Sequence, residues 1–304
     1  MMSKHPFAKI GQGQTLVRRT EAVADGMQIW LWENMTEAQT GECPPLLFFD
    51  SGVGGLSVLD ETMKLLPCAP IIYAADYAGL PYGMKSEAEL AARVPALLGR
   101  LVERYRPQLA TIACNTASTI ALDHVRSALN IPVVGTVPAI KPASETSQTG
   151  VIGLLGTQAT IRQPYVDRLA ADFAADKILL RHAAPGLVHA AEAKLRGEAP
   201  DIGVIDAAIS GLLDQDGGDR IDTVILACTH FPLLRDELAA AARRPIQFID
   251  GAQGIARRIA YLTRDISWPD ESREGIFVTT GDLADIAPYR SAFAKYGISR
   301  FEQL

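Results

Sequence analysis

The segment "LATIACNTASTIAL", residues 109–122, runs from a strand-like stretch into a helix-like one and places Cys114 at the junction. Small polar residues follow that cysteine directly. The segment "DTVILACTHFPLLRDEL", residues 222–238, repeats the pattern around Cys228. Short, continuously apolar runs are typical of strands covered by helices on both faces of a sheet. The two segments therefore predict buried parallel strands, each with a cysteine at its carboxyl end.

The same alternation extends from residue 46 to the C-terminal region. Segments such as "SEAELAARVPALLGRLVERY" and "TIRQPYVDRLAADFAA" have apolar residues at helical spacing. They separate short apolar runs, most of them bounded by Gly, Pro or Asp: "LLFFD", "PIIYAAD", "LATIAC", "IPVVGT", "GVIGLLG", "DKILLRH", "IDTVILAC", "PIQFID" and "GIFVTT". Strands that alternate with amphipathic helices predict an α/β protein with mostly parallel sheets.

A faint internal duplication indicates two similar α/β domains. "LLFFDSGVGGLSVL" and "GVIGLLGTQATI" each read as a strand, a glycine-containing turn and a helix, and each precedes a cysteine strand by a similar distance. We expect the first domain to comprise residues 46–137 and 246–304, and the second residues 138–245. Residues 1–45 lack sustained periodicity and are predicted to be an N-terminal extension, ordered by docking of Trp30 and Trp32 on the main body.

The composition is that of a globular protein and excludes several function classes. The chain has 304 residues, 48% of them hydrophobic, with a net charge of −6 and a pI of about 5.4. We therefore expect no direct nucleic-acid contact. No secretory signal and no apolar run long enough for a membrane span are visible, so we expect a cytoplasmic location. With four cysteines and no metal-type spacing, neither a disulfide framework nor a metal site is predicted.

A cysteine at the end of a parallel strand has two interpretations. Ligands of open α/β sheets bind outside the carboxyl ends of the strands, and the N-terminus of the following helix favours a negative charge. We therefore expect Cys114 and Cys228 to have lowered thiol pKa values and to act as a base or nucleophile. Free cysteine is also a common buried hydrophobe. We prefer that second interpretation for Cys43 and Cys68, which lack this context.

The polar residues beside the two cysteines also have two interpretations. Asn115, Thr116, Ser118 and Thr229 stand at expected helix starts, where such residues often cap the helix. Together with free backbone N–H groups they would also form a pocket for small anionic groups such as carboxylates.

Several motifs in combination resemble the glutamate racemases of bacterial cell-wall synthesis, in the aspartate/glutamate racemase family. The resemblance begins near residue 46 and continues in order to the C-terminus. The His in "CTH" is similar to the glutamate branch rather than the aspartate branch. The extension and "VPAIKPA" resemble the Gram-negative subgroup. The matching segments are "FFDSGVGGLSV", "YAADYAGLPYGMKSEAEL", "ACNTASTIAL", "IPVVGTVPAIKPA", "GVIGLLGTQATI", "AEAKLRGE" and "LACTHFPLL".

The resemblance implies cofactor-independent interconversion of L- and D-glutamate for peptidoglycan synthesis. Cys114 and Cys228 would stand on opposite faces of the substrate Cα, one thiolate removing the proton while the other thiol delivers one. Asp50 and His230 match the family's thiol-assisting groups, and Glu192 matches a further acidic residue near the second thiol. The substrate-binding positions of the family match Asp50, Ser51, Tyr82, Gly83, Asn115, Thr116, Thr160, Thr229 and His230.

Each of these residues also has an ordinary structural interpretation. Asp50 is a plausible helix cap, His230 a hydrogen-bonded buried histidine, Glu192 a solvated helix residue and Tyr82 a packed turn residue. Tyr77 and Leu80 stand where many members of the family carry other residues. Neither of those two departures touches a cysteine.

The resemblance also adds partners and alternatives. In the subgroup it points to, UDP-N-acetylmuramoyl-L-alanine activates the enzyme, and some glutamate racemases inhibit DNA gyrase, so both molecules are candidate partners. The oligomeric state, monomer or homodimer, stays open. The competing hypotheses are a racemase for aspartate or a related amino acid, a gyrase-binding protein, and a pyridoxal-phosphate racemase, for which no lysine motif is visible.

Overall fold

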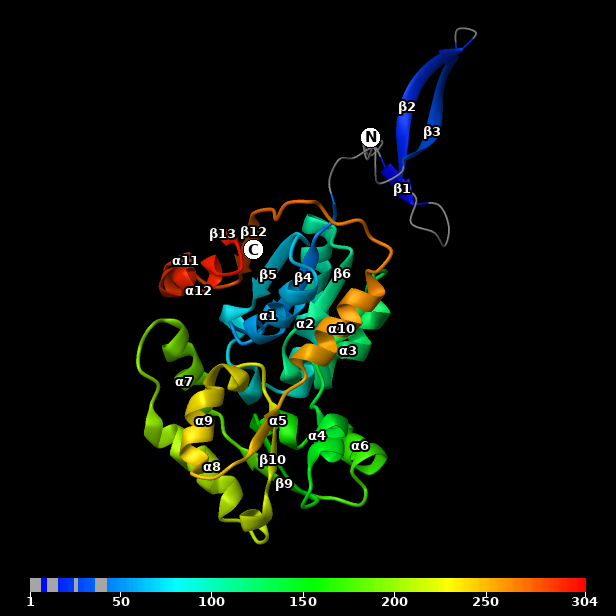
Figure 1. Ribbon diagram of the computed structural model, residues 1–304. Coiled ribbons are helices and arrows are strands. Elements are labelled where there is room, and N and C mark those ends of the chain that lie inside the picture. The colour runs from blue at the N-terminus through cyan, green and yellow to red at the C-terminus, as the bar shows by residue number, and fades with distance from the viewer. Residues whose placement is uncertain (1–6, 10–15, 25–26, 36–42) are drawn as a thin grey trace. The chain divides into compact units, whose positions relative to one another are not determined.

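The computed structural model describes residues 7–9, 16–24, 27–35 and 43–304 (Figure 1). The chain divides after Pro44 into two compact units. The first unit holds a three-stranded antiparallel sheet of strand order β1–β2–β3, formed by β1 (Phe7–Lys9), β2 (Leu16–Ala24) and β3 (Met27–Met35).

These strands lie in a segment whose sequence shows no sustained periodicity. β2 and β3 pair along their full lengths, from Leu16 opposite Met35 to Ala24 opposite Met27. The patch "MQIWLW" is therefore part of a strand. The expected docking of Trp30 and Trp32 concerns side chains that lie outside the described part of the structure.

The second unit, Pro45–Leu304, contains two parallel sheets. The larger one has six strands in the order β13–β12–β5–β4–β6–β7. All of its pairings are parallel. The strands are β4 (Leu46–Asp50), β5 (Ile71–Ala75), β6 (Leu109–Ile112), β7 (Val133–Gly135), β12 (Gly275–Thr279) and β13 (Ile298–Gln303).

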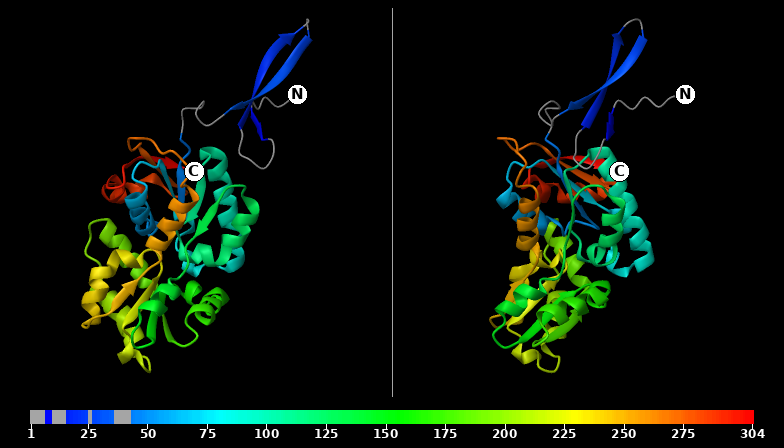
Figure 2. Two further views of the ribbon diagram at one scale, coloured as in Figure 1. Left: turned by 45° about the vertical axis from the view of Figure 1, so that its right-hand side comes forward. Right: turned by 90° about the vertical axis from the view of Figure 1, so that its right-hand side faces the viewer.

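Helices cover both faces of this sheet, which explains why its central strands are continuously apolar. Phe48 and Leu46 of β4 pack with α1, α10 and α12, whereas Phe49 and Leu47 pack with α2 and α3 on the other face. Figures 1 and 2 show α10 and α2 on opposite sides of the sheet. The helices are α1 (Leu56–Leu65), α2 (Glu87–Tyr105), α3 (Asn115–Ala128), α10 (Ala252–Leu262), α11 (Leu283–Ile286) and α12 (Arg290–Ala294).

The smaller sheet has four parallel strands in the order β11–β10–β8–β9. Helices α7 and α8 pack on one face, and α4 and α6 pack on the other. The strands are β8 (Val151–Gly156), β9 (Ile178–Ala183), β10 (Thr223–Ala227) and β11 (Gln247–Ile249). The helices are α4 (Ile140–Thr146), α5 (Gln158–Ile161), α6 (Pro164–Phe173), α7 (Gly186–Leu195), α8 (Ile202–Leu213) and α9 (Arg235–Ala242).

Short 3₁₀ turns complete the second unit at the ends of strands and helices. They are η2 (Tyr77–Gly79), η3 (Tyr82–Met84), η4 (Gly218–Arg220), η5 (Phe231–Leu234) and η6 (Ala287–Tyr289). In the described part of the chain, no helix combines the length and apolar character needed to span a bilayer.

The local sequence explains where the longest of these helices begins and what it buries. The side chain of Ser86 accepts a hydrogen bond from the backbone N–H of Glu89, which caps α2. Leu90, Val94, Leu98 and Leu101 then recur at spacings of three and four residues, and all four are buried. The helix ends at Arg106, which has the left-handed conformation with φ of 48°.

The predicted fold class, an α/β protein with mostly parallel sheets, is confirmed. Every apolar run named above contains a strand of the second unit. Within residues 246–304, which are expected to belong to the first domain, β11 (Gln247–Ile249) pairs with β10 in the smaller sheet. The edge strand β13, which pairs with β12 in the larger sheet, is not expected from the sequence because its residues form no apolar run. The division of this unit into two domains stays a prediction.

Candidate active site

Both buried cysteines stand at the carboxyl ends of parallel strands, as the sequence predicts. Cys114 follows β6 and occupies the N-cap position of α3, whereas Cys228 follows β10 of the other sheet. Their exposed fractions are 5% and 7%. Asn115, the neighbour of Cys114, lines the same small hollow as Cys228. The two strand ends therefore share one site.

Asp50 reaches the first thiol through a serine. Ser51 Oγ donates a hydrogen bond to Asp50 Oδ1 at 3.1 Å and lies 3.8 Å from Cys114 Sγ. The other carboxylate oxygen, Asp50 Oδ2, accepts from the backbone N–H of Gly55 and from Thr229 Oγ1, the latter at 3.2 Å. Thr229 belongs to the loop after β10, so this fully buried carboxylate links the loops of both sheets.

The expected lowering of the Cys114 pKa is wrong. Burial raises the pKa of this thiol well above its ordinary value, and the negative charge of Asp50 raises it further. The backbone N–H of Ala117, in the first turn of α3, acts in the opposite direction. Desolvation and a neighbouring carboxylate therefore outweigh the helix N-terminus, and Cys114 is a neutral thiol at physiological pH.

The second thiol has a different partner. Cys228 Sγ lies 3.9 Å from His230 Nδ1, and the other ring nitrogen, Nε2, lies 3.0 Å from Glu192 Oε1. Burial by itself lowers the pKa of His230, but the hydrogen bonds and charges of Cys228 and Glu192 raise it well above its usual value. His230 is therefore a buried cation between a sulfur and a carboxylate.

Glu192 is buried rather than solvated. It projects from α7 and is 5% exposed. Its Oε2 accepts hydrogen bonds from Tyr289 at 2.6 Å and from Tyr77 at 3.3 Å. Burial alone raises the pKa of this carboxyl, but the hydrogen bonds from His230, Tyr289 and Tyr77 outweigh it and lower the pKa. Tyr77 thus contacts the group beside the second thiol.

Three threonines close another side of the site. Thr116 of α3 lies 3.0 Å from Thr157 and 3.3 Å from Thr160, measured between hydroxyl oxygens, and Thr157 lies 3.0 Å from Thr160. Thr116 and Thr160 were predicted, whereas Thr157 was missed. The signal for Thr157 was its place between "GLLG" and the helix start, where its side chain caps α5.

Tyr82 is placed by a buried ion pair that sequence reasoning missed. Its hydroxyl donates to Asp76 Oδ2 at 2.6 Å, and the residue packs in the same buried cluster as Cys114. The Asp76 carboxylate also accepts two hydrogen bonds from Arg93, at 2.5 and 2.7 Å, and one from Thr280 at 2.6 Å. The sequence signal for this ion pair is Asp76 itself, an aspartate that directly follows the apolar strand β5. The adjoining Gly83 lies against Thr157, where a Cβ would be 3.0 Å from the threonine Cβ.

The glycines of "DSGVGG" allow the loop after β4 to lie against the second thiol's partners. A Cβ on Gly52 would lie 2.8 Å from Glu192 Oε1, and a Cβ on Gly54 would lie 2.7 Å from the backbone nitrogen of His230. Both distances are shorter than real contacts of a Cβ. These positions need glycine because of the close approach of another loop, and not because of a positive φ.

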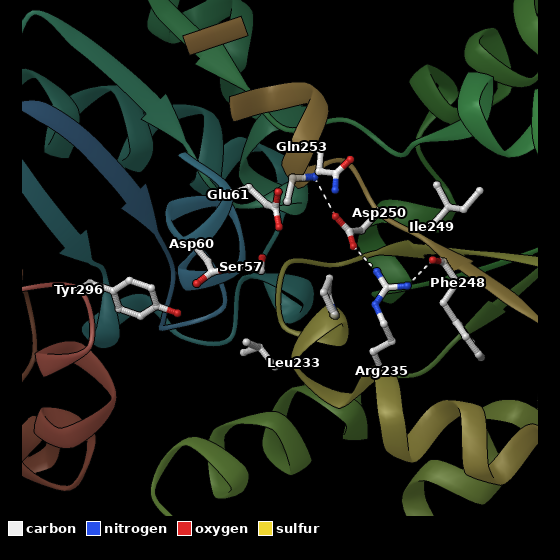
Figure 3. A pocket seen from close by; sticks show the side chains of 12 residues that line it. Ser57, Asp60, Glu61, Leu233, Arg235, Phe248, Ile249, Asp250, Gln253 and Tyr296 are labelled. Carbon is white, nitrogen blue, oxygen red and sulfur yellow. Dashed lines mark hydrogen bonds and ion pairs between the residues drawn. The ribbon is translucent and has the colours of Figure 1, made fainter. Parts of the chain in front are cut away.

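Two hollows adjoin this arrangement. The smaller, of about 10 Å³, is lined by residues that include Asn115, Cys228 and Thr229. The larger has a volume of about 660 Å³ and lies between α1 on one side and η5, α9 and β11 on the other. Figure 3 shows the side chain of Arg235 in it, directed at Asp250 and at the backbone oxygen of Phe248. Neither thiol lines the larger hollow.

A metal site is not visible in residues 43–304 or in the three short strands before them. No three His, Cys, Asp or Glu side chains gather there in a way that could hold an ion. The chemical groups that do converge are two thiols, a carboxylate beside each, one histidine and several hydroxyl and amide donors. This set can move protons and bind carboxylates.

Comparison with known proteins assigns this arrangement to a class. Residues 57–259 match the model of the Asp/Glu/hydantoin racemase family, and the chain belongs to this family. Its relatives include the glutamate racemase of Sphingopyxis alaskensis, which is 65% identical over 258 residues, covering 85% of this chain and 96% of that protein. The glutamate racemase of Pectobacterium carotovorum is 42% identical over 265 residues, covering 86% and 91%.

Solved structures agree with these relatives. The crystal structure of Escherichia coli glutamate racemase in complex with L-glutamate and the activator UDP-MurNAc-Ala has a TM-score of 0.80 and 38% sequence identity, covering 86% of this chain and 98% of that one. The glutamate racemase isoform RacE1 from Bacillus anthracis has a TM-score of 0.70 and 26% identity. The family and the fold expected from the sequence are thus confirmed.

Proposed function

We infer that the protein interconverts L- and D-glutamate, supplying the D-enantiomer for peptidoglycan, without a cofactor. The observation that carries this inference is the pair of buried cysteines at the ends of strands from two sheets, each with its own acid–base partner. Inversion of one carbon by two bases needs a proton-transfer group on each face of that carbon. The chain belongs to a racemase family, and its similar relatives are named glutamate racemases, which supports glutamate as the substrate.

The two sulfurs exchange roles in each turnover. One thiolate takes the Cα proton, and the electron pair left on Cα becomes carbanion-like and is delocalised toward the α-carboxylate. The other thiol then gives its proton to the opposite face, so that the product has the inverted configuration and the thiol has become a thiolate. In the free enzyme Cys114 is a neutral thiol, and the ring of His230 lies beside Cys228 with a raised pKa.

The remaining groups have roles in binding. Asn115, Thr116 and Thr160 lie beside the N-terminus of α3, where free N–H groups bind carboxylates. Ser51 and Thr229 are hydrogen-bonded to Asp50, whose negative charge suits the substrate ammonium group. Tyr82 and Gly83 contribute the turn beside Thr157. Preorganised donors of this kind supply the stabilisation that the weakly acidic Cα–H requires.

We expect the substrate to enter by a movement of the two sheets. A hollow of about 10 Å³ between the strand ends has room for roughly one water molecule and cannot hold glutamate. The groups that join the sheets here are side chains and loops, for example Ser57 Oγ, which donates to the backbone oxygen of Thr229 at 3.0 Å. Closure around the substrate would then exclude water from the proton transfers.

Single-thiol variants test this function. We expect Cys114→Ala and Cys228→Ala each to abolish racemisation of L- and D-glutamate, followed by circular dichroism, while each retains its fold because the change costs about 1–2 kcal/mol. Each variant should still eliminate a leaving group from one enantiomer of a glutamate analogue, and the two variants should prefer opposite enantiomers. Equal residual racemisation in both variants would contradict the two-thiol assignment.

Two controls separate this function from its enzyme alternatives. Aspartate replaces glutamate in the same assay, and turnover of aspartate at the glutamate rate would favour a racemase of broader or different specificity. Exhaustive removal of pyridoxal phosphate should leave the rate unchanged, since the proposed chemistry uses only side chains. Loss of activity in that experiment would point to a cofactor enzyme.

Two interactions with partners are proposed separately. The Escherichia coli relative was crystallised with an activator, and we propose that UDP-N-acetylmuramoyl-L-alanine also raises turnover here. Turnover of the full chain and of residues 45–304, each with and without this compound, tests the proposal and the involvement of the N-terminal extension. Inhibition of DNA gyrase is an independent prediction, and a Cys114→Ser protein that still inhibits would show that the two roles are separable.

A further inference from the structure

The carboxylate beside the second thiol is held from its far side by a residue of the C-terminal segment. Tyr289, in η6, donates its hydroxyl hydrogen to Glu192 Oε2 at 2.6 Å. The tyrosine is 3% exposed, so water does not compete for this contact. The opposite oxygen of the same carboxylate contacts His230. A continuous series of contacts thus joins Cys228, His230, Glu192 and Tyr289.

The direction of the hydrogen bond between Tyr289 and Glu192 is set by an arginine. Arg196 Nη1 lies 2.8 Å from the hydroxyl oxygen of Tyr289. Because a guanidinium can only donate, the tyrosine oxygen must accept from it, and its own hydrogen must go to Glu192. Arg196 is itself held by Glu198 through Nε and Nη2, at 2.9 and 2.8 Å. The phenol is therefore oriented as a donor to Glu192.

The series also spans the two sheets. Glu192 and Arg196 belong to α7 and its end, which packs on the four-stranded sheet. Tyr289 and the second phenol, Tyr77, belong to segments that pack on the six-stranded sheet. Thus both donors to Glu192 Oε2 come from the side of the site that carries Cys114, although the carboxylate that they hold lies beside the partner of Cys228.

We propose that Tyr289 is a positioning residue for proton transfer at Cys228, acting through Glu192 and His230. It fixes the carboxylate in the orientation that pairs with His230 Nε2, and His230 Nδ1 is then directed at the sulfur. This inference rests on the proposed function, in which Cys228 is one of two bases. Tyr289 does not contact Cys114, whose partners are Ser51 and Asp50. Its effect should therefore be confined to one face of the substrate.

An elimination assay measures each face separately. A glutamate analogue with chloride on Cβ loses its Cα proton to one thiolate, the Cβ–Cl bond breaks, and the enamine product hydrolyses to the oxo acid and ammonium. In Cys114→Ala only Cys228 performs this step, and in Cys228→Ala only Cys114 does. Tyr289→Phe, which keeps the ring and removes the hydroxyl, is introduced into both backgrounds, and oxo-acid release is measured.

We expect Tyr289→Phe to slow elimination about tenfold in the Cys114→Ala background, because a hydrogen bond to a charged group typically changes an equilibrium by about this factor or more. In the Cys228→Ala background the rate should stay within about twofold. Tyr105→Phe is the matched control, since Tyr105 also donates at 2.6 Å to a glutamate, Glu302, but away from the thiols. It should change neither rate. Arg196→Met should reproduce a weaker form of the Tyr289→Phe effect.

The outcomes distinguish the inference from the function on which it rests. Equal losses in both backgrounds, or no loss in either, would overturn the positioning role while leaving the two-thiol function intact. Racemisation that survives Cys228→Ala would instead overturn the proposed function. If Tyr289→Phe lowers the melting temperature so far that the assay is not interpretable, Tyr77→Phe asks the same question at the same carboxylate oxygen, and an equal effect on both faces would again overturn the inference.

Discussion

The loop after β4 packs so closely on the second thiol's histidine that a single methyl group should displace it. A Cβ on Gly54 would lie 2.7 Å from both the ring Cγ and the backbone nitrogen of His230. This is roughly 0.7 Å closer than ordinary van der Waals contact begins. Gly54 is not among the residues with positive φ, so alanine can adopt its backbone conformation. Any effect of Gly54→Ala is therefore steric.

The size of the effect follows from which atoms must move. A side-chain tip could rotate away, but the backbone nitrogen of His230 can move only with its whole loop. We expect a loss of unfolding free energy of about 2–3 kcal/mol, the upper part of the range for overpacking. His230 Nδ1 lies 3.9 Å from Cys228 Sγ, and lengthening this contact misplaces an acid–base group. A displacement of about 1 Å typically reduces turnover about a hundredfold.

Urea unfolding and racemisation assays of Gly54→Ala measure both quantities. Gly99→Ala is the matched control, because Gly99 lies inside α2 and a Cβ there would have no atom within 4 Å. That variant should be more stable by about 1 kcal/mol, with unchanged turnover. If Gly54→Ala stays within about 0.5 kcal/mol of the wild type and racemises normally, the close packing of the two loops inferred here is wrong.

Two further changes test the groups that hold the site together. Arg93→Met leaves the fully buried Asp76 without its cation and should lower the unfolding free energy by about 3 kcal/mol at pH 6. Burial raises the pKa of Asp76, but hydrogen bonds from Arg93, Thr280 and Tyr82 outweigh it and place the pKa below its usual value of 3.8. The ionised Asp76 carboxylate therefore adds to the unfolding free energy of the wild type above pH 3.8, and this contribution is lost as the pH falls through the lowered pKa. The unfolding free energies of the wild type and of Arg93→Met, measured by urea titration, should consequently converge below pH 3.8. Thr157→Val removes the hydroxyl that contacts Thr116 and Thr160, and it should raise KM for glutamate about tenfold with a smaller change in kcat. A larger change in kcat than in KM would exclude a role of this threonine cluster in ground-state binding.

The sequence predicts most of the parallel-sheet scaffold because its signal is local. A buried strand such as β4 is apolar at every position and is followed by a glycine-rich turn, so a window of a few residues suffices to recognise it. β13 was missed because only Ile298 is buried among its residues and no apolar run marks it. The strand β11 shows a second limit, since sequence alone does not state which of two sheets a short strand joins.

The residues of the candidate site also differ in how far the sequence alone reveals them. Cys114, Cys228 and their neighbours are recognisable from strand ends and motifs. Glu192 is not distinguishable by its surroundings in the sequence from a solvated helix residue, and its burial depends on Tyr289 and Tyr77. The Cys114 pKa was predicted in the wrong direction, because a helix N-terminus is visible in the sequence whereas burial beside Asp50 is not.

The sequence by itself determined the succession of the strands from β4 to β12 and the placing of a cysteine after β6 and after β10. Those features depend on residues within a few positions of one another. The tertiary structure alone decided that the pKa of Cys114 is raised, which carboxylate lies beside which thiol, and which phenols hold the Glu192 carboxylate. The reason is distance along the chain: Tyr77 and Glu192 are 115 residues apart, and Asp50 and Thr229 are 179 apart. Contacts of that separation, and the desolvation that accompanies them, exist only once the two sheets have packed together.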